Sequence, residues 1–229
     1  MNRRDLADLA GSVGLGAGAA LGLLTMIVVG RDGAPLDQDT HALHWFLGHR
    51  SAETVALARG VTATGTGVVP YALVVLAGCL VGRSARQRLT ATALGLLCLA
   101  GGQALRLTVM LLVHRPRPPA ADWAGHASGW AFPSGHTTTA ALTAGILLIA
   151  VRLRAPRGGT PLMCAVVLWG LLVGVSRAVL AVHWATDVLA GWLFAAAWAG
   201  GCLCAAAWWL PQDLTPARAP APHDPAEAS

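Results

Sequence analysis

Four side chains that could do chemistry lie close together in one apolar stretch, Ser176 to Asp187 (SRAVLAVHWATD). They are a hydroxyl, a guanidinium, an imidazole and a carboxylate, at Ser176, Arg177, His183 and Asp187. If the stretch is helical, His183 and Asp187 share a face, so the carboxylate can hold one ring nitrogen and leave the other unprotonated. An oriented imidazole beside a cation suits attack on an anionic electrophile such as a phosphate.

Each of these residues also has a structural interpretation. A His-x3-Asp pair on a helix is often a simple hydrogen bond, and an arginine near a membrane often contacts lipid phosphates. Ionisable groups in apolar membrane sequence are nevertheless costly and commonly functional. The catalytic interpretation therefore needs a second group of polar residues.

Two further motifs supply that group. Phe132 to His136 (FPSGH) leads into an apolar run, and Arg115 to Pro118 (RPRP) follows another. Together with the first stretch they resemble the type 2 phosphatidic acid phosphatase (PAP2) family, membrane lipid phosphatases that share a site with vanadium haloperoxidases. The family pattern is Lys-x6-Arg-Pro, then Pro-Ser-Gly-His, then Ser-Arg-x5-His-x3-Asp. The matching positions, in order, are Arg117, Pro118, Pro133, Ser134, Gly135, His136, Ser176, Arg177, His183 and Asp187.

This resemblance implies catalytic roles for three residues. His183 would attack phosphorus to form a phosphohistidine, and Asp187 would orient it. His136 would protonate the departing oxygen and then activate water. The resemblance thus implies a hydrolase without a cofactor.

The other motif residues suit a phosphate-binding site. Arg117 and Arg177 carry forked donors for phosphate oxygens. Ser134 stands at a helix N-cap position, Gly135 lets the backbone come close, and the following helix directs N–H groups at an anion. Arg115 and Ser176 are possible supports.

A metal held by His136, His183 and Asp187 is the competing interpretation of the same residues. Two guanidiniums beside it would repel a divalent cation and attract an oxyanion. We therefore expect no metal site, activity that survives chelators, and inhibition by vanadate as a phosphate mimic. Haloperoxidase activity is not expected from so apolar a chain.

The family's lysine position is occupied by Met110, and the chain has no lysine at all. Arg106, one helical turn earlier, could supply the missing cation. However, helical side chains lean toward the N-terminus of their helix, which would point Arg106 away from the site. The alternative is an arginine paired inside the bundle.

Composition indicates an all-α, polytopic membrane protein. Of 229 residues, 55% are hydrophobic and 12% charged, and about 20 apolar residues cross a bilayer. Residues 1–211 would form one six-span domain and 212–229, rich in Pro and Ala, a disordered cytoplasmic tail. The predicted spans are Gly11 to Gly30, which we expect to be retained rather than cleaved, Val61 to Gly82, Leu89 to Val113, Gly135 to Val151, Pro161 to Val179 and Trp184 to Leu210.

The arginines predict the orientation, since they favour cytoplasmic loops. With the N-terminus inside, eight lie on the inner side and five on the outer side. The inner eight are Arg3, Arg4, Arg83, Arg86, Arg88, Arg152, Arg154 and Arg157; the outer five are Arg31, Arg50, Arg59, Arg115 and Arg117. Both termini would be cytoplasmic and all three motifs would meet at the extracytoplasmic face of the cell membrane.

Other features predict less. The net charge of +5 is explained by topology and motif, so we expect no nucleic-acid partner. The five cysteines fall in predicted spans and indicate no disulfide framework. Asp39 is a candidate N-cap of a helix along the outer surface whose Leu43 face is apolar. The loop from Pro119 to Phe132 is either a wall of the site or part of an interfacial aromatic belt.

The predicted function is hydrolysis of a lipid phosphate or pyrophosphate at the outer leaflet. By analogy with the family, an outward site suits recycling of a polyprenyl (undecaprenyl) diphosphate; phosphatidic acid and phosphatidylglycerophosphate are the alternatives. A lipid phosphotransferase could use the same phosphohistidine with another acceptor. A lipid-binding bundle without catalysis would be favoured only if Met110 had disabled the site.

Overall fold

The computed structural model describes residues 3–155 and 158–209, and every regular element in these ranges is helical. The elements are α1 (Arg3–Gly30), α2 (Asp37–His49), α3 (Ala52–Thr64), α4 (Val68–Val81), α5 (Ala85–Val113), the short 3₁₀ helix η1 (Ala120–Asp122), α6 (Gly135–Arg154), α7 (Thr160–Val179) and α8 (Ala185–Trp209). Helices α1, α5, α6, α7 and α8 are each long and apolar enough to cross a membrane. The bent pair α3 and α4 can form a sixth span, so the predicted all-α, six-span bundle is confirmed. The predicted tail, 212–229, lies outside the described residues.

The second span differs from its prediction as one straight helix from Val61 to Gly82. Helices α3 and α4 meet at an angle of 51° across a short break. Gly67 in this break has a φ of +66°, a conformation that suits glycine. A Cβ built on Gly65 would lie 2.3 Å from Val173 of α7, so the chain passes α7 too closely for a side chain there. The fourth span, predicted to end at Val151, continues to Arg154 and is 20 residues long.

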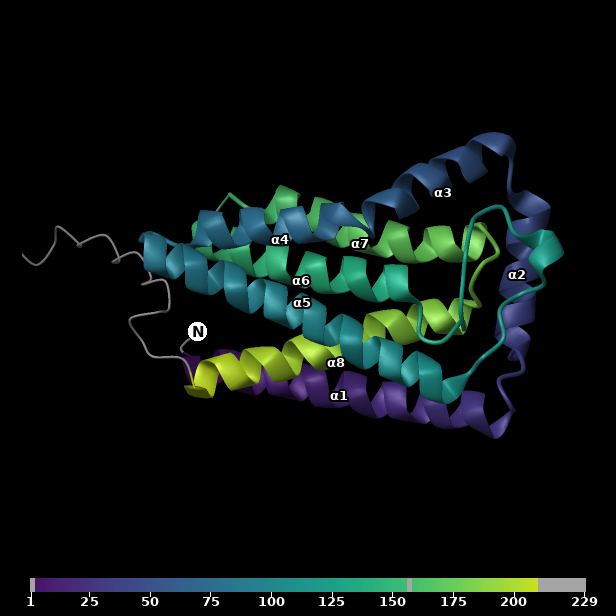
Figure 1. Cartoon of the computed structure of the whole chain (residues 1–229), viewed down its shortest axis with the longest axis horizontal. Helices are drawn as coiled ribbons and strands as arrows, with labels where there is room; N and C mark the ends of the chain where they lie inside the picture. Colours follow the sequence, from purple (N-terminus) through teal and green to yellow (C-terminus); the bar gives the residue numbers. More distant parts are fainter. Residues whose placement is uncertain (1–2, 156–157, 210–229) are drawn as a thin grey trace, which may run out of the picture.

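Helix α6 is the centre of the bundle (Figure 1). It contacts α4, α5, α7 and α8, while α1 packs along α8. Helix α2 lies across one end of the bundle, where the connections after α1, after α5 and between α7 and α8 also gather (Figure 1). The three sequence motifs therefore meet at one end of the molecule.

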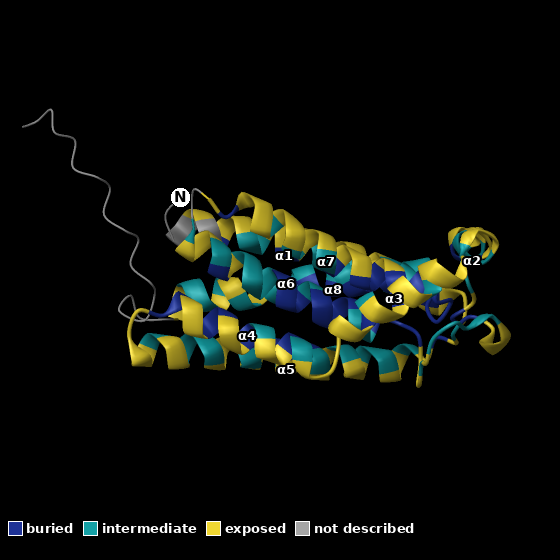
Figure 2. Cartoon of the chain, turned by 90° about the horizontal axis from the view of Figure 1, so that it is seen from above, coloured by how far each residue is buried: buried dark blue, intermediate teal, exposed yellow. Residues whose placement is uncertain are grey.

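Burial follows the arrangement expected for a bundle in lipid. Buried residues are concentrated on α6, α7 and α8 in the middle of the bundle (Figure 2). Large apolar side chains such as Leu15, Met26, Leu97 and Leu112 are exposed on the outer surface. A long apolar helix with an apolar exposed face is typical of a membrane span, because lipid replaces water around it.

The contact between α1 and α8 depends on glycine. A Cβ on Gly200 would lie 2.6 Å from the Ala10 carbonyl oxygen and 2.7 Å from the Gly14 Cα, whereas a Cβ on Gly201 would meet no atom within 4 Å. We expect Gly200→Ala to force the two backbones apart and to destabilise the protein by about 1–3 kcal/mol. Gly201→Ala, the neighbouring control, should leave the melting temperature in detergent unchanged or slightly higher. Equal melting temperatures for the two variants would contradict this packing.

Helix α2 begins differently from the prediction. Its N-cap is Leu36, and Asp39 lies in the first turn with its carboxylate accepting the Leu36 N–H at 3.1 Å. Leu43 is buried, and Phe46 and Leu47 are partly buried beside it, so the predicted apolar face is confirmed. Asp39 is itself fully buried, which a simple N-cap at the surface would not be.

Candidate active site

His183 and Asp187 come together across a bend, because the stretch from Ser176 is not one continuous helix. Helix α7 ends at Val179, and α8 begins only at Ala185. Between them Ala181 has a φ of +54°, a left-handed conformation that breaks the helix. Asp187 stands in the first turn of α8, where its Oδ2 accepts the Trp184 N–H at 2.9 Å. A carboxylate that reaches back to the start of its helix in this way is held in a fixed position.

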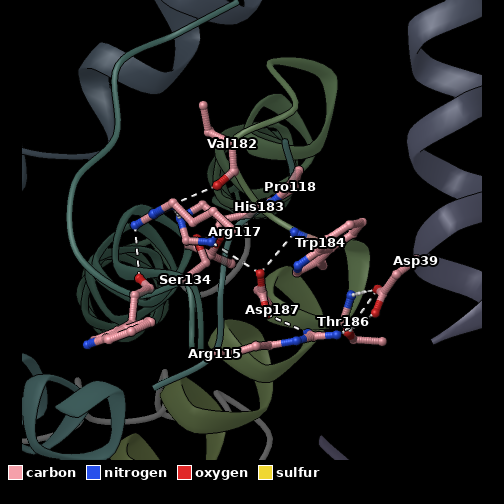
Figure 3. Close-up of polar contacts among 12 residues, drawn as sticks. Asp39, Arg115, Arg117, Pro118, Ser134, Val182, His183, Trp184, Thr186 and Asp187 are labelled. Carbon is pink, nitrogen blue, oxygen red and sulfur yellow. Dashed lines mark hydrogen bonds and ion pairs between the residues drawn. The ribbon is translucent and has the colours of Figure 1, made fainter. Parts of the chain in front are cut away.

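The two nitrogens of His183 have different neighbours (Figure 3). Nδ1 lies 3.5 Å from Asp187 Oδ2, and Nε2 lies 2.9 Å from Arg117 Nη1. Because a guanidinium can only donate, the Arg117 contact assigns Nε2 as the unprotonated nitrogen. The ring proton is then on Nδ1, which faces Asp187 but is buried without a hydrogen bond in this structure. The imidazole therefore has the tautomer that a nucleophilic Nε2 requires.

His136 and His183 line the same cavity, which has a volume of about 410 Å³. Its wall is formed by side chains of α5, α6 and α7, by the break between α3 and α4, and by the loop before α6. The lining residues are Thr66, Gln103, Arg106, Leu107, Met110, Arg117, His126, Ala127, Ser128, Gly129, Trp130, Gly135, His136, Thr139, Arg177 and His183. The loop from Pro119 to Phe132 thus contributes a wall of the cavity, Trp130 included.

All five N–H groups of Arg117 have acceptors in this structure. Nε donates to the Gly129 carbonyl, Nη2 to the Ser128 and Trp130 carbonyls, and Nη1 to the Val182 carbonyl and to His183 Nε2, at distances of 2.7–3.0 Å. Burial lowers the pKa of the guanidinium from its usual value. Arg117 therefore holds the 128–130 loop against His183, and all of its donors are occupied by groups of the protein itself.

Arg177 and Arg106 are the cavity arginines with donors to spare. Arg177 donates from Nη1 to Thr62 Oγ1 at 3.0 Å and from Nη2 to the His126 carbonyl at 3.4 Å, and its buried Nε has no acceptor. Among the described residues, the hydrogen bonds of Arg106 are limited to one from Nη1 to the Met110 sulfur at 3.3 Å, and its Nε is also buried without an acceptor. No carboxylate within the described ranges pairs with Arg106.

The position of Arg106 overturns the expectation that it points away from the site. A Cβ built on Gly135 would lie 3.4 Å from its Cζ and from its Nη1. The reason is the register of two antiparallel helices: Gln103 of α5 is hydrogen-bonded to Thr139 of α6, so the start of α6 is level with Arg106. Met110 lies one turn nearer the C-terminal end of α5, against Gly129 of the loop.

Four predicted site residues do not line the cavity, and one of them is Asp187, which is fully buried behind His183. Ser134 is buried at the N-cap position, but its hydroxyl accepts from Thr137 Oγ1 at 2.9 Å and does not cap α6. Ser176 donates to the Val173 carbonyl of its own helix at 2.6 Å. Arg115 is fully buried behind Asp187. Because no side chain caps α6, its first N–H groups at Gly135 and beyond are left for an anion.

A buried ionic network that the sequence did not predict lies behind Asp187 (Figure 3). Arg115 bridges two carboxylates, Asp39 of α2 and Asp187 of α8, at 2.6 Å each. Thr186 donates its N–H and its hydroxyl to Asp39 Oδ1, at 2.9 and 2.8 Å. A sequence signal for Asp39 is absent because its partner Arg115 is 76 residues away along the chain.

The three side chains of the competing metal interpretation, His136, His183 and Asp187, do not form a group of ligands in the structure. Across residues 3–155 and 158–209, no three histidine, cysteine or acidic side chains are grouped so that they could hold a metal ion. Asp187 has both oxygens engaged, one by Arg115 and the other by the Trp184 N–H. The five cysteines are unbridged.

The helices and the exposed apolar surface define an integral membrane protein with six spans, if the bent pair is counted as one. Residues 90–211, more than half of the chain, match the sequence profile of the PAP2 superfamily, and the chain belongs to that family.

Two kinds of relative agree with this membership. Phosphatidylglycerophosphatase B of Escherichia coli K12 is 40% identical over 87 residues, which is 38% of this chain and 31% of that protein. The proteins of the same name from Escherichia coli O157:H7 and Shigella flexneri match equally. The match thus spans about a third of the length of these curated relatives. The crystal structure of a transmembrane PAP2 type phosphatidylglycerolphosphate phosphatase from Bacillus subtilis superposes with a TM-score of 0.70 at 20% identity, covering 83% of this chain and 94% of that one.

Proposed function

We propose that this protein hydrolyses a lipid phosphate through a phosphohistidine on His183. The observation that carries the proposal is the cavity itself, which is lined by three histidines, His136 and His183 among them, and by three arginines. Arg106 and Arg177 have donors to spare there, while the described carboxylate next to His183, Asp187, is fully buried behind it. A site with this excess of positive charge suits an oxyanion.

Two proton transfers complete the proposed reaction. His183 Nε2 attacks phosphorus, and the bond from phosphorus to the lipid oxygen breaks as His136 protonates that oxygen. His136 then takes a proton from a water molecule, which attacks the phosphohistidine and releases inorganic phosphate. Asp187 stabilises the charge that develops on the His183 ring.

Electrostatic stabilisation of the transferred phosphoryl group is the second part of the mechanism. Arg177, Arg106 and the N–H groups at the start of α6 would bind its oxygens. Arg117 would join them when substrate displaces its loop carbonyls. Its Nη1, which donates to His183 Nε2 at 2.9 Å, would turn to a phosphate oxygen and so free the Nε2 lone pair for attack. Ser134 supports the first turn of α6 rather than the phosphate.

The names of the relatives favour phosphatidylglycerophosphate as the substrate. Polyprenyl diphosphate stays a prediction from the sequence, and so does transfer to an acceptor other than water. We also propose that the site faces outward and both termini inward. The inner arginines Arg83, Arg86, Arg152 and Arg154 lie at the ends of α5 and α6 remote from the cavity, which supports that orientation through the preference of arginine for cytoplasmic loops.

The test is phosphate release by purified protein in lipid micelles. Phosphatidylglycerophosphate, phosphatidic acid and undecaprenyl diphosphate are offered separately, with and without glycerol or lipid alcohols as acceptors. We expect release from phosphatidylglycerophosphate to be fastest, to survive EDTA and to be inhibited by vanadate. Acceptor-dependent transfer without release would favour the phosphotransferase, and inactivity with all three substrates would overturn the proposal.

A pH dependence follows from the environment of His183. Burial lowers its pKa to about 4, although the neighbouring Asp187 acts in the opposite direction. The neutral, nucleophilic form should therefore predominate above pH 4, whereas an ordinary histidine is half protonated near pH 6.5. Nitrogen NMR of histidine-labelled protein, with His183→Ala to assign the signal, should show no His183 titration between pH 8 and 5. A titration midpoint between 6 and 7 would contradict this.

A further inference from the structure

The guanidinium of Arg115 divides its two terminal nitrogens between two carboxylates. Nη1 lies 2.6 Å from Asp187 Oδ1, and Nη2 lies 2.6 Å from Asp39 Oδ2. All three side chains are fully buried, and neither Asp39 nor Arg115 lines the cavity. The contact with Asp187 is therefore made through a single nitrogen, although an arginine facing a lone carboxylate prefers to bind both of its oxygens.

Because Arg115 binds only Oδ1 of Asp187, the second carboxylate oxygen, Oδ2, is left to face His183. Oδ2 faces His183 Nδ1 at 3.5 Å and accepts the Trp184 N–H at 2.9 Å. If Arg115 took both carboxylate oxygens, Oδ2 would turn from the imidazole toward the guanidinium. Asp39 prevents this because it occupies Nη2, and Thr186 holds Asp39 in place with two hydrogen bonds to Oδ1.

We propose that Asp39 is a positioning residue for catalysis, which keeps Asp187 aimed at His183 by holding the other half of the Arg115 guanidinium. This rests on the proposed role of His183 as the nucleophile. It also gives α2, which lies across the end of the bundle, a function in the site: through Asp39, α2 is connected to the nucleophile by two buried ion pairs (Figures 1 and 3).

The decisive variant is Asp39→Asn, which keeps the shape of the side chain and removes its charge. Arg115 should then turn to Asp187 with both nitrogens. We expect kcat to fall about 10- to 100-fold, as when outer partners of an oriented histidine are removed. KM and vanadate affinity should change less than about threefold, because the cavity arginines are untouched. Asp37→Asn, an exposed aspartate on the same helix, is the matched control and should behave as the unmodified protein.

A double-mutant cycle separates positioning from general destabilisation. Arg115→Met removes the guanidinium that would turn, so adding Asp39→Asn to it should cost no further activity. A loss in kcat that is the same in both backgrounds would overturn the proposal, as would a parallel loss of vanadate affinity in Asp39→Asn.

The tautomer of His183 provides a readout that does not depend on hydrolysis. Nitrogen NMR of the full protein should show a ring protonated mainly at Nδ1, and Asp39→Asn should convert it into a mixture of both tautomers. An unchanged tautomer in Asp39→Asn refutes the positioning role. Inactivity of the unmodified protein toward every lipid phosphate refutes only the proposed function, so the two failures are distinguishable.

Discussion

His183→Ala should lower kcat/KM for lipid phosphate hydrolysis by at least about 10⁴-fold, since loss of a nucleophile that acts together with its partners removes nearly all of their catalysis. The imidazole contacts Arg117 through Nε2 and faces Asp187 through Nδ1. Binding should survive, because Arg106 and Arg177 keep their positions. The measurement is steady-state phosphate release, together with the vanadate dissociation constant.

His114→Ala is the matched control for this variant. His114 is exposed at the end of α5 and lies outside the cavity. It should retain activity within about threefold of the unmodified protein, and both variants should melt at similar temperatures. If His183→Ala kept more than a few per cent of the activity, another nucleophile would have to be sought.

Arg106→Met should lower kcat/KM by about 10²–10³-fold. This is the usual effect of removing one hydrogen-bond donor to the negative charge that develops in a site from which water is excluded. Methionine retains most of the volume and the apolar stem, so the loss would be that of the charge. An arginine with a purely structural role would need a partner, but its only hydrogen bond among the described residues is to the Met110 sulfur. The measurement is kcat/KM and vanadate affinity, both of which should fall.

The neighbouring methionine makes a rescue experiment possible. Met110 also lines the cavity, and its sulfur lies 3.3 Å from Arg106 Nη1. A lysine at position 110 should therefore place its ammonium near the lost guanidinium. We expect Arg106→Met/Met110→Lys to be at least about tenfold more active than Arg106→Met alone. Failure of this rescue, with normal activity in Met110→Lys alone, would show that Arg106 does more than supply charge. Full activity of Arg106→Met would exclude it from the site.

The number of long helices, some of their ends and the convergence of the motifs could be predicted from the sequence, because apolar length and motif order are visible in the sequence itself. Gly135 was predicted as the start of the fourth span and Val113 as the end of the third, and both are confirmed. His136 and His183 were predicted to share one pocket, and the structure places them there.

The details that were missed depend on contacts between distant residues. The left-handed Ala181 ends α7 before His183, so the condition of one continuous helix is not met, although His183 and Asp187 do meet. Arg106 lies level with the start of α6 because of the register between α5 and α6. A rule about side-chain direction within a single helix cannot predict that register. Asp39 was interpreted as a cap, because its partner Arg115 follows only after the bent span of α3 and α4 and the long helix α5.

Trapping of the phosphoenzyme tests the central claim most directly. Protein mixed with substrate labelled in its phosphate is quenched within milliseconds at alkaline pH, where phosphohistidine persists, and is then digested for mass spectrometry. We predict one phosphorylated residue, His183, with more label accumulating in His136→Ala, in which release to water is slowed. Label on any other residue, or rapid hydrolysis by the unmodified protein with no trapped phosphoenzyme in either form, would contradict the account.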